Sequence, residues 1–592
     1  KQDLIGKYQI AGNEKVPLST LESLLTTEAG QPYSSTTIMG DRDAVLTYYY
    51  SHGFDHATVK LSQNPEKGHA DRIDVTLQVS EGEQIFVNKV VTSGLHFTRP
   101  STVEPHILLQ PGEPLNQSAL LESQRQLYDL TLFNEVNTAV QNPGGELPRK
   151  NVLVQFTEAK RWDLSYGVGF QAQTGNPSTS CPNPVSLIQL GINPADVSCG
   201  PNGKTGASAL VLFDISRINL WGRNQSVTLR TEYGSLEQVA TTIYSFPHIF
   251  NLKSLDFSLS GGYTNAQDVT TYAASRLEGT VRFTHRLNLA NTLFYQFTYR
   301  RVKVDPNSVQ VAPNEIPLVS EPVRVGGPGL TWIRDTRRPS PLDATAGTYT
   351  SMEEFATDNV FASEANFNRL DLSNSSYYDL GKRHFILARN TRFGFERAFG
   401  QEKYEYIPLP ERLYAGGAQS LRAYSINAAG PRDSLTGFPV GGAGVFVNSG
   451  ELRFPNPTLP YVGTSLGFVL FHDMGNVFNN SSDIWRSAIR IKQPHSWTCR
   501  DLDPDHQKAV TRSSSTNNTG TCDFNYFTHD VGLGLRYHTP IGPIRLDFSY
   551  TLNPPIYPVI VTYGTHSDGS PILPHVEQAP HFNFFFSIGQ AF

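Results

Sequence analysis

The segment PIRLDFSYTL, residues 543–552, alternates between apolar and polar side chains. Successive residues of a β-strand point to opposite faces, so this period of two predicts a strand with two chemically different faces. The apolar face carries Ile544, Leu546, Phe548, Tyr550 and Leu552. The polar face carries Arg545, Asp547, Ser549 and Thr551. The dry core of a soluble β-sandwich could not hold such charges, whereas the hydrated lumen of a membrane barrel can.

The same alternation begins near Lys160 and continues to the last residue. It recurs in DLSYGVGFQ (163–171), QSVTLRTEY (225–233) and HFNFFFSIGQAF (581–592). Strands of roughly nine to eleven residues are long enough to cross the outer membrane. We count about sixteen of them, an even number that returns the end of the chain to the side on which the barrel begins.

The connections between these strands alternate in length. Short turns such as HTPIGP (538–543) and FPNPTLPYVG (454–463) alternate with long polar segments at 304–326, 399–444 and 479–527. Short turns on one side and long loops on the other are typical of outer-membrane barrels. No run of about 20 apolar residues is present, which excludes a transmembrane helix. The sequence therefore predicts that residues 161–592 form a closed, antiparallel, all-β transmembrane barrel.

The first 160 residues contain two similar units, 1–82 and 83–160, without this alternation. Each unit has an extended segment, two helical segments and two further strands. This β-α-α-β-β order predicts a small α+β domain in which two helices cover one face of a sheet. In the second unit, Leu120, Leu121, Leu127 and Tyr128 fall near one face of a predicted helix.

The composition limits the cellular compartment and the classes of binding partner that the chain can have. The net charge is −6 and no basic tract is present, which makes nucleic acid an unsuitable partner. The four cysteines form two local pairs, Cys181 with Cys199 and Cys499 with Cys522, within long polar loops. We expect two disulfides made in an oxidising compartment, with four unpaired thiols as the alternative. No zinc or other metal motif is present. The chain opens at Lys1 without a signal peptide, so we expect an export signal to have been removed.

Five motifs make the chain resemble the BamA/TamA outer-membrane assembly-factor superfamily, whose members carry POTRA domains ahead of a barrel. They are GLTWIRDTRRPSPLDATAG (329–347), GGAQSLRAYSINAAGPRD (416–433), GELRFP (450–455), FHDMGNVF (471–478) and GLGLRYHTPIGPIRLDFSYTLN (532–553). The two N-terminal units resemble POTRA domains. The resemblance thus covers the whole chain and implies a barrel in the bacterial outer membrane with the POTRA domains in the periplasm.

The resemblance also gives a role to the loop at 399–444. In the family this loop folds back into the lumen, where its arginine meets acidic residues of neighbouring strands. Carried over by position, Arg422 approaches Glu451 and Asp473, because a guanidinium between carboxylates can hold an otherwise flexible loop. The expected members of this loop site are Gly416, Gly417, Arg422, Tyr424, Gly430, Glu451 and Asp473. The family usually has glycine where this chain has Ala423, so the turn requires a negative φ there.

A second candidate site is the seam where the first strand meets the last to close the barrel. Its residues are Leu164, Tyr166, Gly167, Gly169, Phe586, Gly589 and Phe592. Glycine weakens strands, so we expect the seam to be the softest part of the wall and to pair with a client strand. The alternative is that these glycines only make space for the lumen loop.

Neither catalysis nor a cofactor is expected. GTSLG (463–467) fits the serine-nucleophile pattern, but strand residues follow it where a helix is required. GPNGKT (200–205) ends like a phosphate loop but lacks the first glycine, because position 198 is serine. We therefore predict no catalytic residue, no bound nucleotide and no metal.

The resemblance implies a subunit that inserts and folds β-barrel proteins into the outer membrane by strand pairing at POTRA edges and at the seam. The implied partners are unfolded outer-membrane β-barrel clients, periplasmic chaperones, accessory assembly subunits and outer-membrane lipid. Two alternatives stay open. One is a two-partner-secretion translocator that exports one dedicated substrate, and the other is a passive porin.

Overall fold

The computed structural model describes residues 3–588 apart from 67, 70, 145–146, 174–205, 235–236, 270–271, 305–322, 342, 382–384, 400–406, 433–438, 459, 461–462, 464, 495–523, 540–543 and 560–574. The chain divides into two compact units. One comprises Lys1–Asp163 with Ser216–Ser226, and the other comprises Leu164–Ile215 with Val227–Phe592. All four cysteines, and with them the predicted disulfides, lie outside the described residues.

The first POTRA-like unit has the predicted β-α-α-β-β order. Its elements are β1 (Leu4–Ala11), α1 (Leu18–Glu22), α2 (Ser35–Ser51), β2 (Thr58–Pro65) and β3 (Arg72–Ser80). Strand β3 lies in the middle of the sheet, parallel to β1 and antiparallel to β2. Helix α2 begins where the Ser34 hydroxyl accepts the Thr37 backbone N–H, which satisfies one free donor of the first turn. Apolar side chains of the helices and strands form the core.

The second unit repeats this plan with β4 (Phe86–Ser93), α3 (Pro100–Val103), η1 (Glu104–His106), α4 (Gln117–Asp129), β5 (Phe133–Val140) and β6 (Arg149–Glu158). Its sheet order, β4-β6-β5, matches that of the first unit. The predicted apolar face of α4 is partly wrong. Leu127 is fully buried, but Leu121 is 65% exposed and Tyr128 is 40% exposed. The Tyr128 hydroxyl instead accepts the Val136 backbone N–H. Tyr128 therefore lies at the edge of the core, where its ring is partly exposed and its hydroxyl has a hydrogen-bond partner.

Both POTRA-like units use a glutamate at the end of the last strand to fix the loop after the first strand. Glu81 accepts the backbone N–H groups of Lys15 at 2.7 Å and Val16 at 3.2 Å, and the Tyr49 hydroxyl at 2.9 Å. Desolvation alone would raise the pKa of Glu81, but these hydrogen bonds outweigh it and hold the pKa below its ordinary value. Glu81 therefore holds the loop after β1 against the end of β3.

Glu158 occupies the equivalent place in the second unit. It accepts the backbone N–H groups of Phe97 at 3.1 Å and Thr98 at 2.7 Å. Desolvation would raise the pKa of Glu158, and the hydrogen bonds from Thr98 and Phe97 lower it below the ordinary value.

Replacing Glu81 with glutamine is expected to destabilise the loop at Lys15 by about 1–3 kcal/mol at neutral pH, because hydrogen bonds to a charged group are lost. A depressed folded-state pKa stabilises the fold above the unfolded pKa and loses that effect as the pH falls through the folded pKa. The difference between wild type and Glu81→Gln should therefore shrink below about pH 4.5. Hydrogen exchange of the Lys15 and Val16 amides in the full chain, corrected for intrinsic rates, measures it. Glu83→Gln, an exposed glutamate two residues on, should change nothing.

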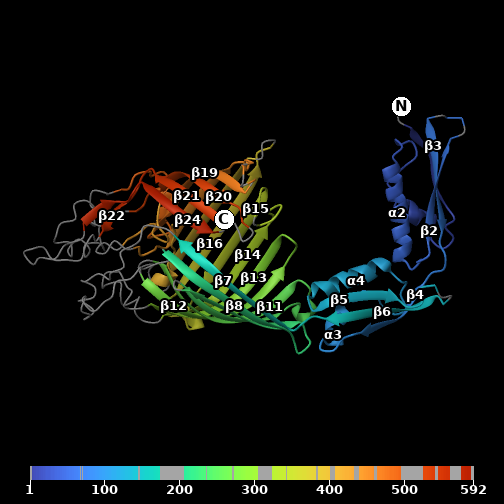
Figure 1. The fold of residues 1–592 in the computed structure, drawn as a ribbon, viewed down its shortest axis with the longest axis horizontal. Helices are drawn as coiled ribbons and strands as arrows, with labels where there is room; N and C mark the ends of the chain where they lie inside the picture. The colour runs from blue at the N-terminus through green and yellow to red at the C-terminus, as the bar shows by residue number, and fades with distance from the viewer. Residues whose placement is uncertain are drawn as a thin grey trace, which may run out of the picture. The chain divides into compact units, whose positions relative to one another are not determined.

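Among the residues that the structure describes, the second compact unit contains most of a single sheet of sixteen strands, which confirms the predicted number of about sixteen. The strands are β7 (Trp162–Gln173), β8 (Gly206–Leu220), β9 (Gln225–Gly234), β10 (Glu237–Phe246), β11 (Leu255–Val269), β12 (Tyr272–Arg286), β13 (Asn291–Val304), β14 (Val323–Asp335), β15 (Gly347–Ala356), β16 (Phe367–Asp379), β17 (Ile386–Ala398), β18 (Gly444–Arg453), β19 (Leu466–Phe478), β20 (Thr528–Tyr537), β21 (Ile544–Thr551) and β24 (Phe582–Ile588). They follow one another in chain order across a curved sheet (Figure 1). A separate hairpin, β22 (Ile556–Val559) with β23 (His575–Gln578), lies in the connection before β24.

The two faces of β21 differ as the alternation predicts. Arg545, Asp547, Ser549 and Thr551 are buried on the inner face. Phe548 and Tyr550 are 38% and 49% exposed on the outer face. An apolar exposed face and a buried charged face invert the usual soluble pattern and fit a barrel with lipid outside. Among the described residues, no helix is long and apolar enough to span a bilayer.

The sheet is barrel-like but not closed within the described residues, where no hydrogen-bonded ladder joins β7 to β24. The expectation of a closed barrel is therefore corrected. Strand β24 pairs with β21 over only the seven positions from Phe582 to Ile588, so it offers few backbone groups to a closing partner. At the other end, Tyr166 and Val168 of β7 are 84% and 88% exposed. The sheet thus presents two end strands.

Candidate functional site

The inner face of the barrel holds Arg422 in a buried ion pair with Asp473. The guanidinium Nε and Nη2 donate to the two carboxylate oxygens of Asp473, each at 2.7 Å, in a bidentate geometry. The backbone N–H of Arg422 also donates to Asp473 at 3.2 Å. Arg422 is 2% exposed and Asp473 is 0% exposed, so the pair is shielded from bulk water. Charge-assisted bidentate bonds of this kind fix both distance and orientation.

Further groups surround the same guanidinium, including the Asp547 carboxylate at 3.6 Å. Its Nη1 donates to Glu451 at 3.1 Å, and its Nη2 donates to the Ser449 hydroxyl at 3.1 Å. Its centre lies 3.4 Å from the centroid of the Phe471 ring, which adds a cation–π contact. Ser449 and Glu451 on β18, and Phe471 and Asp473 on β19, lie two residues apart along each strand. This spacing explains why all four point to the same face.

The charges continue beyond Arg422 across neighbouring strands. Glu451 also binds Arg536 of β20 at 3.3 Å and Arg453 at 3.3 Å. Arg536 in turn binds Asp547 of β21 at 2.5 Å, and Asp547 binds Arg545 at 2.9 Å. The resulting chain of alternating charges, here termed the lumen cluster, consists of Arg422, Glu451, Arg453, Asp473, Arg536, Arg545 and Asp547. It spans β18 to β21 and returns to the loop, because Arg545 donates to the Ala418 carbonyl at 3.1 Å.

Four members of the lumen cluster were not anticipated as site residues: Arg453, Arg536, Arg545 and Asp547. Arg545 and Asp547 were expected on the polar face of β21, but alternation alone cannot show which residues on different strands lie at the same height. The strand register supplies that information, because Arg536 is directly opposite Arg545 and lies beside Asp547.

The loop residues around Arg422 fit tightly. The Tyr424 hydroxyl lies 2.6 Å from the Thr528 hydroxyl, and both residues are buried. Gly416, Gly417 and Gly430 all have left-handed φ values, of 123°, 96° and 85°. A Cβ at Gly430 would lie 2.6 Å from the Val477 carbonyl oxygen, so only glycine fits there. Ala423 does not have a positive φ, so alanine is accommodated at this turn.

The structure places five of the seven predicted seam residues on the two end strands. Leu164 and Tyr166 on β7 are 55% and 84% exposed, and Phe586 on β24 pairs with Leu546 of β21. Gly167 and Gly169 lie within β7. Gly589 and Phe592 lie outside the described residues.

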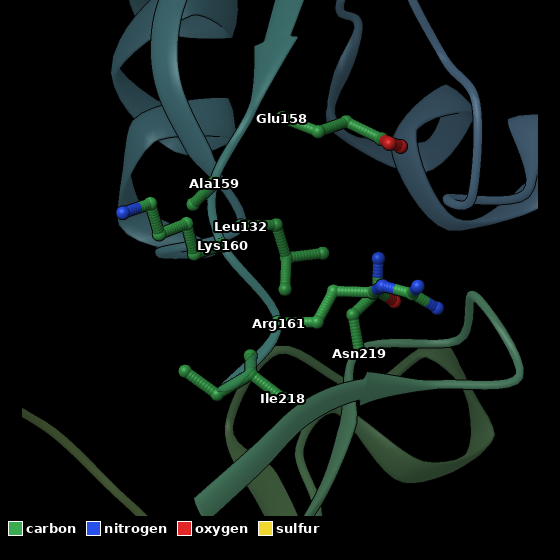
Figure 2. A pocket seen from close by; sticks show the side chains of 7 residues that line it. All are labelled: Leu132, Glu158, Ala159, Lys160, Arg161, Ile218 and Asn219. Atoms are coloured by element: carbon green, nitrogen blue, oxygen red, sulfur yellow. The ribbon is translucent and has the colours of Figure 1, made fainter. Parts of the chain in front are cut away.

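A small cavity lies in the N-terminal compact unit, where the second POTRA-like unit meets the turn at 219–224. Figure 2 shows the seven residues that line it, Leu132, Glu158, Ala159, Lys160, Arg161, Ile218 and Asn219. The Ile218 N–H donates to the Arg161 carbonyl at 2.7 Å, and the Asn219 amide donates to the Thr98 hydroxyl at 2.7 Å.

The turn itself makes further bonds to the second POTRA-like unit. The Arg99 Nε donates to the Trp221 carbonyl at 2.9 Å, and the Thr102 hydroxyl donates to the Gly222 carbonyl at 2.8 Å. Four residues of this turn have positive φ values: Asn219, Trp221, Gly222 and Asn224. Such a backbone conformation is uncommon for residues other than glycine and persists only where the surrounding contacts support it.

Comparison with known protein families identifies the same two regions, a barrel and a POTRA domain, independently of the structure. The family model described as the Omp85 superfamily domain matches residues 219–592. The POTRA model, described as a surface antigen variable number repeat, matches residues 4–82.

Among individual proteins, the chain is similar to two curated outer membrane protein assembly factors named BamA. That of Nitratidesulfovibrio vulgaris is 20% identical over 88% of this chain, and that of Neisseria meningitidis serogroup B is 22% identical over 92%. The chain spans 55% and 64% of the lengths of these relatives.

A solved structure shows the same fold at low identity. The crystal structure of BamA from Haemophilus ducreyi lacking POTRA domains 1-3 superposes with a TM-score of 0.69, at 16% identity and 99% coverage of both chains. Since the Omp85 match alone spans more than half of the chain, the chain belongs to the Omp85 superfamily, with its barrel in the bacterial outer membrane and its POTRA domains in the periplasm.

Proposed function

We propose that this chain acts as an outer-membrane protein assembly factor that inserts and folds β-barrel clients. The names of its two BamA relatives support this role. The POTRA-like units receive client segments at their sheet edges, and the barrel passes client strands into the lipid. Unfolded β-barrel clients, periplasmic chaperones, accessory subunits and outer-membrane lipid are the proposed partners. The role requires strand exchange rather than catalysis, so we propose no catalytic residue and no cofactor.

The observation that carries the proposal is the pair of end strands, β7 and β24, which have no mutual pairing within the described residues. In lipid, the N–H and C=O groups along the edge of a sheet need hydrogen-bond partners within protein, since no water is available to them. A client strand that adds to β7 extends the sheet and supplies hydrogen bonds along that edge. Each bond contributes about 0.5–1.5 kcal/mol net in ordinary contexts. Because no described ladder joins β7 to β24, we propose that adding a client strand to β7 gains such bonds without first breaking a long seam and needs no fuel.

In this proposal the lumen cluster has a supporting role. It holds the loop around Arg422 against β18 to β21, the strands that lead to β24. These strands keep their shape while the seam exchanges partners. The role of the seam residues in client binding is likewise part of the proposal.

A reversible tether across the seam tests the function. Cysteines at Ser165 of β7 and Ser587 of β24 are placed near corresponding ends of the two antiparallel end strands. Oxidation is expected to abolish client insertion into proteoliposomes, because the exit to the lipid is then shut. Reduction of the same sample should restore insertion.

A matched tether controls for the effect of cross-linking itself. Thr280 and Thr298 are directly opposite on β12 and β13, and their hydroxyls lie 3.1 Å apart. Cysteines there link strands that are already paired, so insertion should continue after oxidation. Full insertion with the oxidised seam tether would overturn the proposal. It would show that clients reach the lipid without opening the seam.

A further inference from the structure

The long loop is buried at a second place, eleven residues before Arg422. Ile407, Leu409 and Glu411 are each no more than 2% exposed. Leu409–Glu411 form the short helix η7. Because a carboxylate is rarely buried without partners, Glu411 requires an explanation of its own.

Glu411 is bound by two arginines of the barrel wall. Arg300 of β13 donates through Nε to one carboxylate oxygen at 2.9 Å and through Nη2 to the other. Arg369 of β16 approaches the same carboxylate at 3.3 Å and also donates to the Glu411 carbonyl oxygen. The Arg300 and Arg369 side chains are only 12% and 20% exposed. A carboxylate shared by two shielded guanidinium groups is held in one orientation.

Apolar contacts support the same segment. Leu409 packs with Tyr272 of β12 and Val304 of β13. The Tyr272 hydroxyl donates to the Leu409 carbonyl oxygen at 3.2 Å. Ile407 packs in a separate cluster with Val325, Phe355 and Phe367. The segment is therefore bound to the wall by several elements.

We propose that Ile407–Glu411 form a second anchor of the loop and that Glu411 is a positioning residue for Arg422. The two attachments lie on different parts of the wall: β12 to β16 hold the second anchor, and β18 to β21 hold the lumen cluster. The Arg392 guanidinium of β17 donates to the Tyr414 carbonyl at 3.1 Å between them. A loop fixed at both places follows the inner wall from one group of strands to the next, and fixing one place reduces the entropy lost in ordering the other.

This inference is independent of the client and of the seam. It states that loosening Glu411 frees Arg422, although the two side chains bind different strands. It also states that the loop takes up part of the lumen, because both of its attachments lie on the inner wall.

Trypsin provides the test, since the loop carries arginines near both attachments. Glu411→Gln keeps the shape of the side chain but removes its charge. In full-length protein in proteoliposomes, cleavage after Arg422 is expected to become about tenfold faster or more, because proteolysis follows the population of the open loop. Mass spectrometry assigns the cleaved bond. Ion current through single molecules in planar bilayers should rise in the same variant.

Glu364→Gln is the matched control. Glu364 also pairs with a barrel arginine, Arg324 of β14, at 2.6 Å, but its ion pair does not involve the long loop. It should leave both readouts unchanged. Glu411→Asp retains the charge and should recover part of the protection. If the Glu411→Gln barrel does not show the heat-modifiable gel mobility of a folded barrel, Glu411→Asp is compared with wild type in its place.

Two outcomes would overturn the inference. If Glu411→Gln accelerates cleavage only after Arg412, Glu411 fixes its own turn and does not position Arg422. If cleavage after Arg422 and ion current both stay at wild-type values in a folded Glu411→Gln variant, the second anchor does not hold the loop.

Discussion

Replacing Arg422 with alanine is expected to lower the free energy of unfolding of the barrel by about 3–5 kcal/mol, because it leaves a buried carboxylate without its partner. Asp473 is 0% exposed and receives two guanidinium hydrogen bonds from Arg422. After the substitution, the Ser449 hydroxyl at 2.5 Å is its nearest remaining side-chain donor. Glu451 loses less, since Arg453 and Arg536 still bind it. Urea titration followed by heat-modifiable gel mobility measures the change.

Arg230→Ala is a suitable control for the loss of an arginine from the barrel wall. Arg230 pairs with Asp214 at 3.1 Å, but the two side chains remain 58% and 30% exposed. Exposed pairs contribute about 0–1 kcal/mol, so this variant should stay near wild type. Arg422→Lys should recover only part of the stability, because an ammonium cannot make the bidentate contact.

A double variant identifies the cause of the loss. If Arg422→Ala is costly because Asp473 is stranded, adding Asp473→Asn should cost less than it does in the wild-type background. Strictly additive losses would show that the two side chains act separately. An Arg422→Ala barrel as stable as the Arg230→Ala control would show that the buried ion pair contributes nothing to the fold.

The second large effect is expected for Gly430→Ala, at about 3 kcal/mol or more, because two penalties combine there. The φ of Gly430 is 85°, a left-handed value that costs a non-glycine residue about 1–2 kcal/mol. In addition, the new Cβ would lie 2.6 Å from both the Cβ and the carbonyl oxygen of Val477 on β19. Neither the loop nor the strand can yield without disturbing its hydrogen bonds.

Gly381→Ala separates these two penalties. The φ of Gly381 is 89°, close to that of Gly430, but nothing lies within 4 Å of an added Cβ. This variant should therefore lose only the conformational part, about 1–2 kcal/mol. Stability measured by the same urea titration compares the two directly. Equal losses in both variants would mean that β19 and the loop are not in firm contact at Gly430.

The barrel could be predicted because its physical cause is local. The alternation in PIRLDFSYTL specifies which side chains of one strand share a face, and the structure buries Arg545 and Asp547 while exposing Phe548. Closure could not be predicted in this way, because it depends on pairing between the first and last strands, far apart in the chain. The same reason explains α4, where Tyr128 lies at the rim because its hydroxyl binds Val136 of another element.

The residues of the charged site likewise fall into those that the sequence could identify and those that depend on contacts between distant segments. Arg422, Glu451 and Asp473 could be placed together because each stands in a motif shared with a known superfamily. Arg536 was missed, although it stands in such a motif, because its role depends on the register that brings it between Glu451 and Asp547. Glu411 was missed because a single glutamate among prolines and leucines has no periodic signal. Only its burial against Arg300 and Arg369 distinguishes it.

The hydrogen bonds of Glu81 and Glu158 also have a consequence for the number of POTRA-like units that such a chain can carry. Glu81 bonds to Lys15, Val16 and Tyr49, and Glu158 bonds to Phe97 and Thr98, all within their own units. A repeat that completes its own fold with its own last strand can be duplicated or deleted as a cassette. Adding or removing such a repeat would leave these internal hydrogen bonds of the remaining repeats in place.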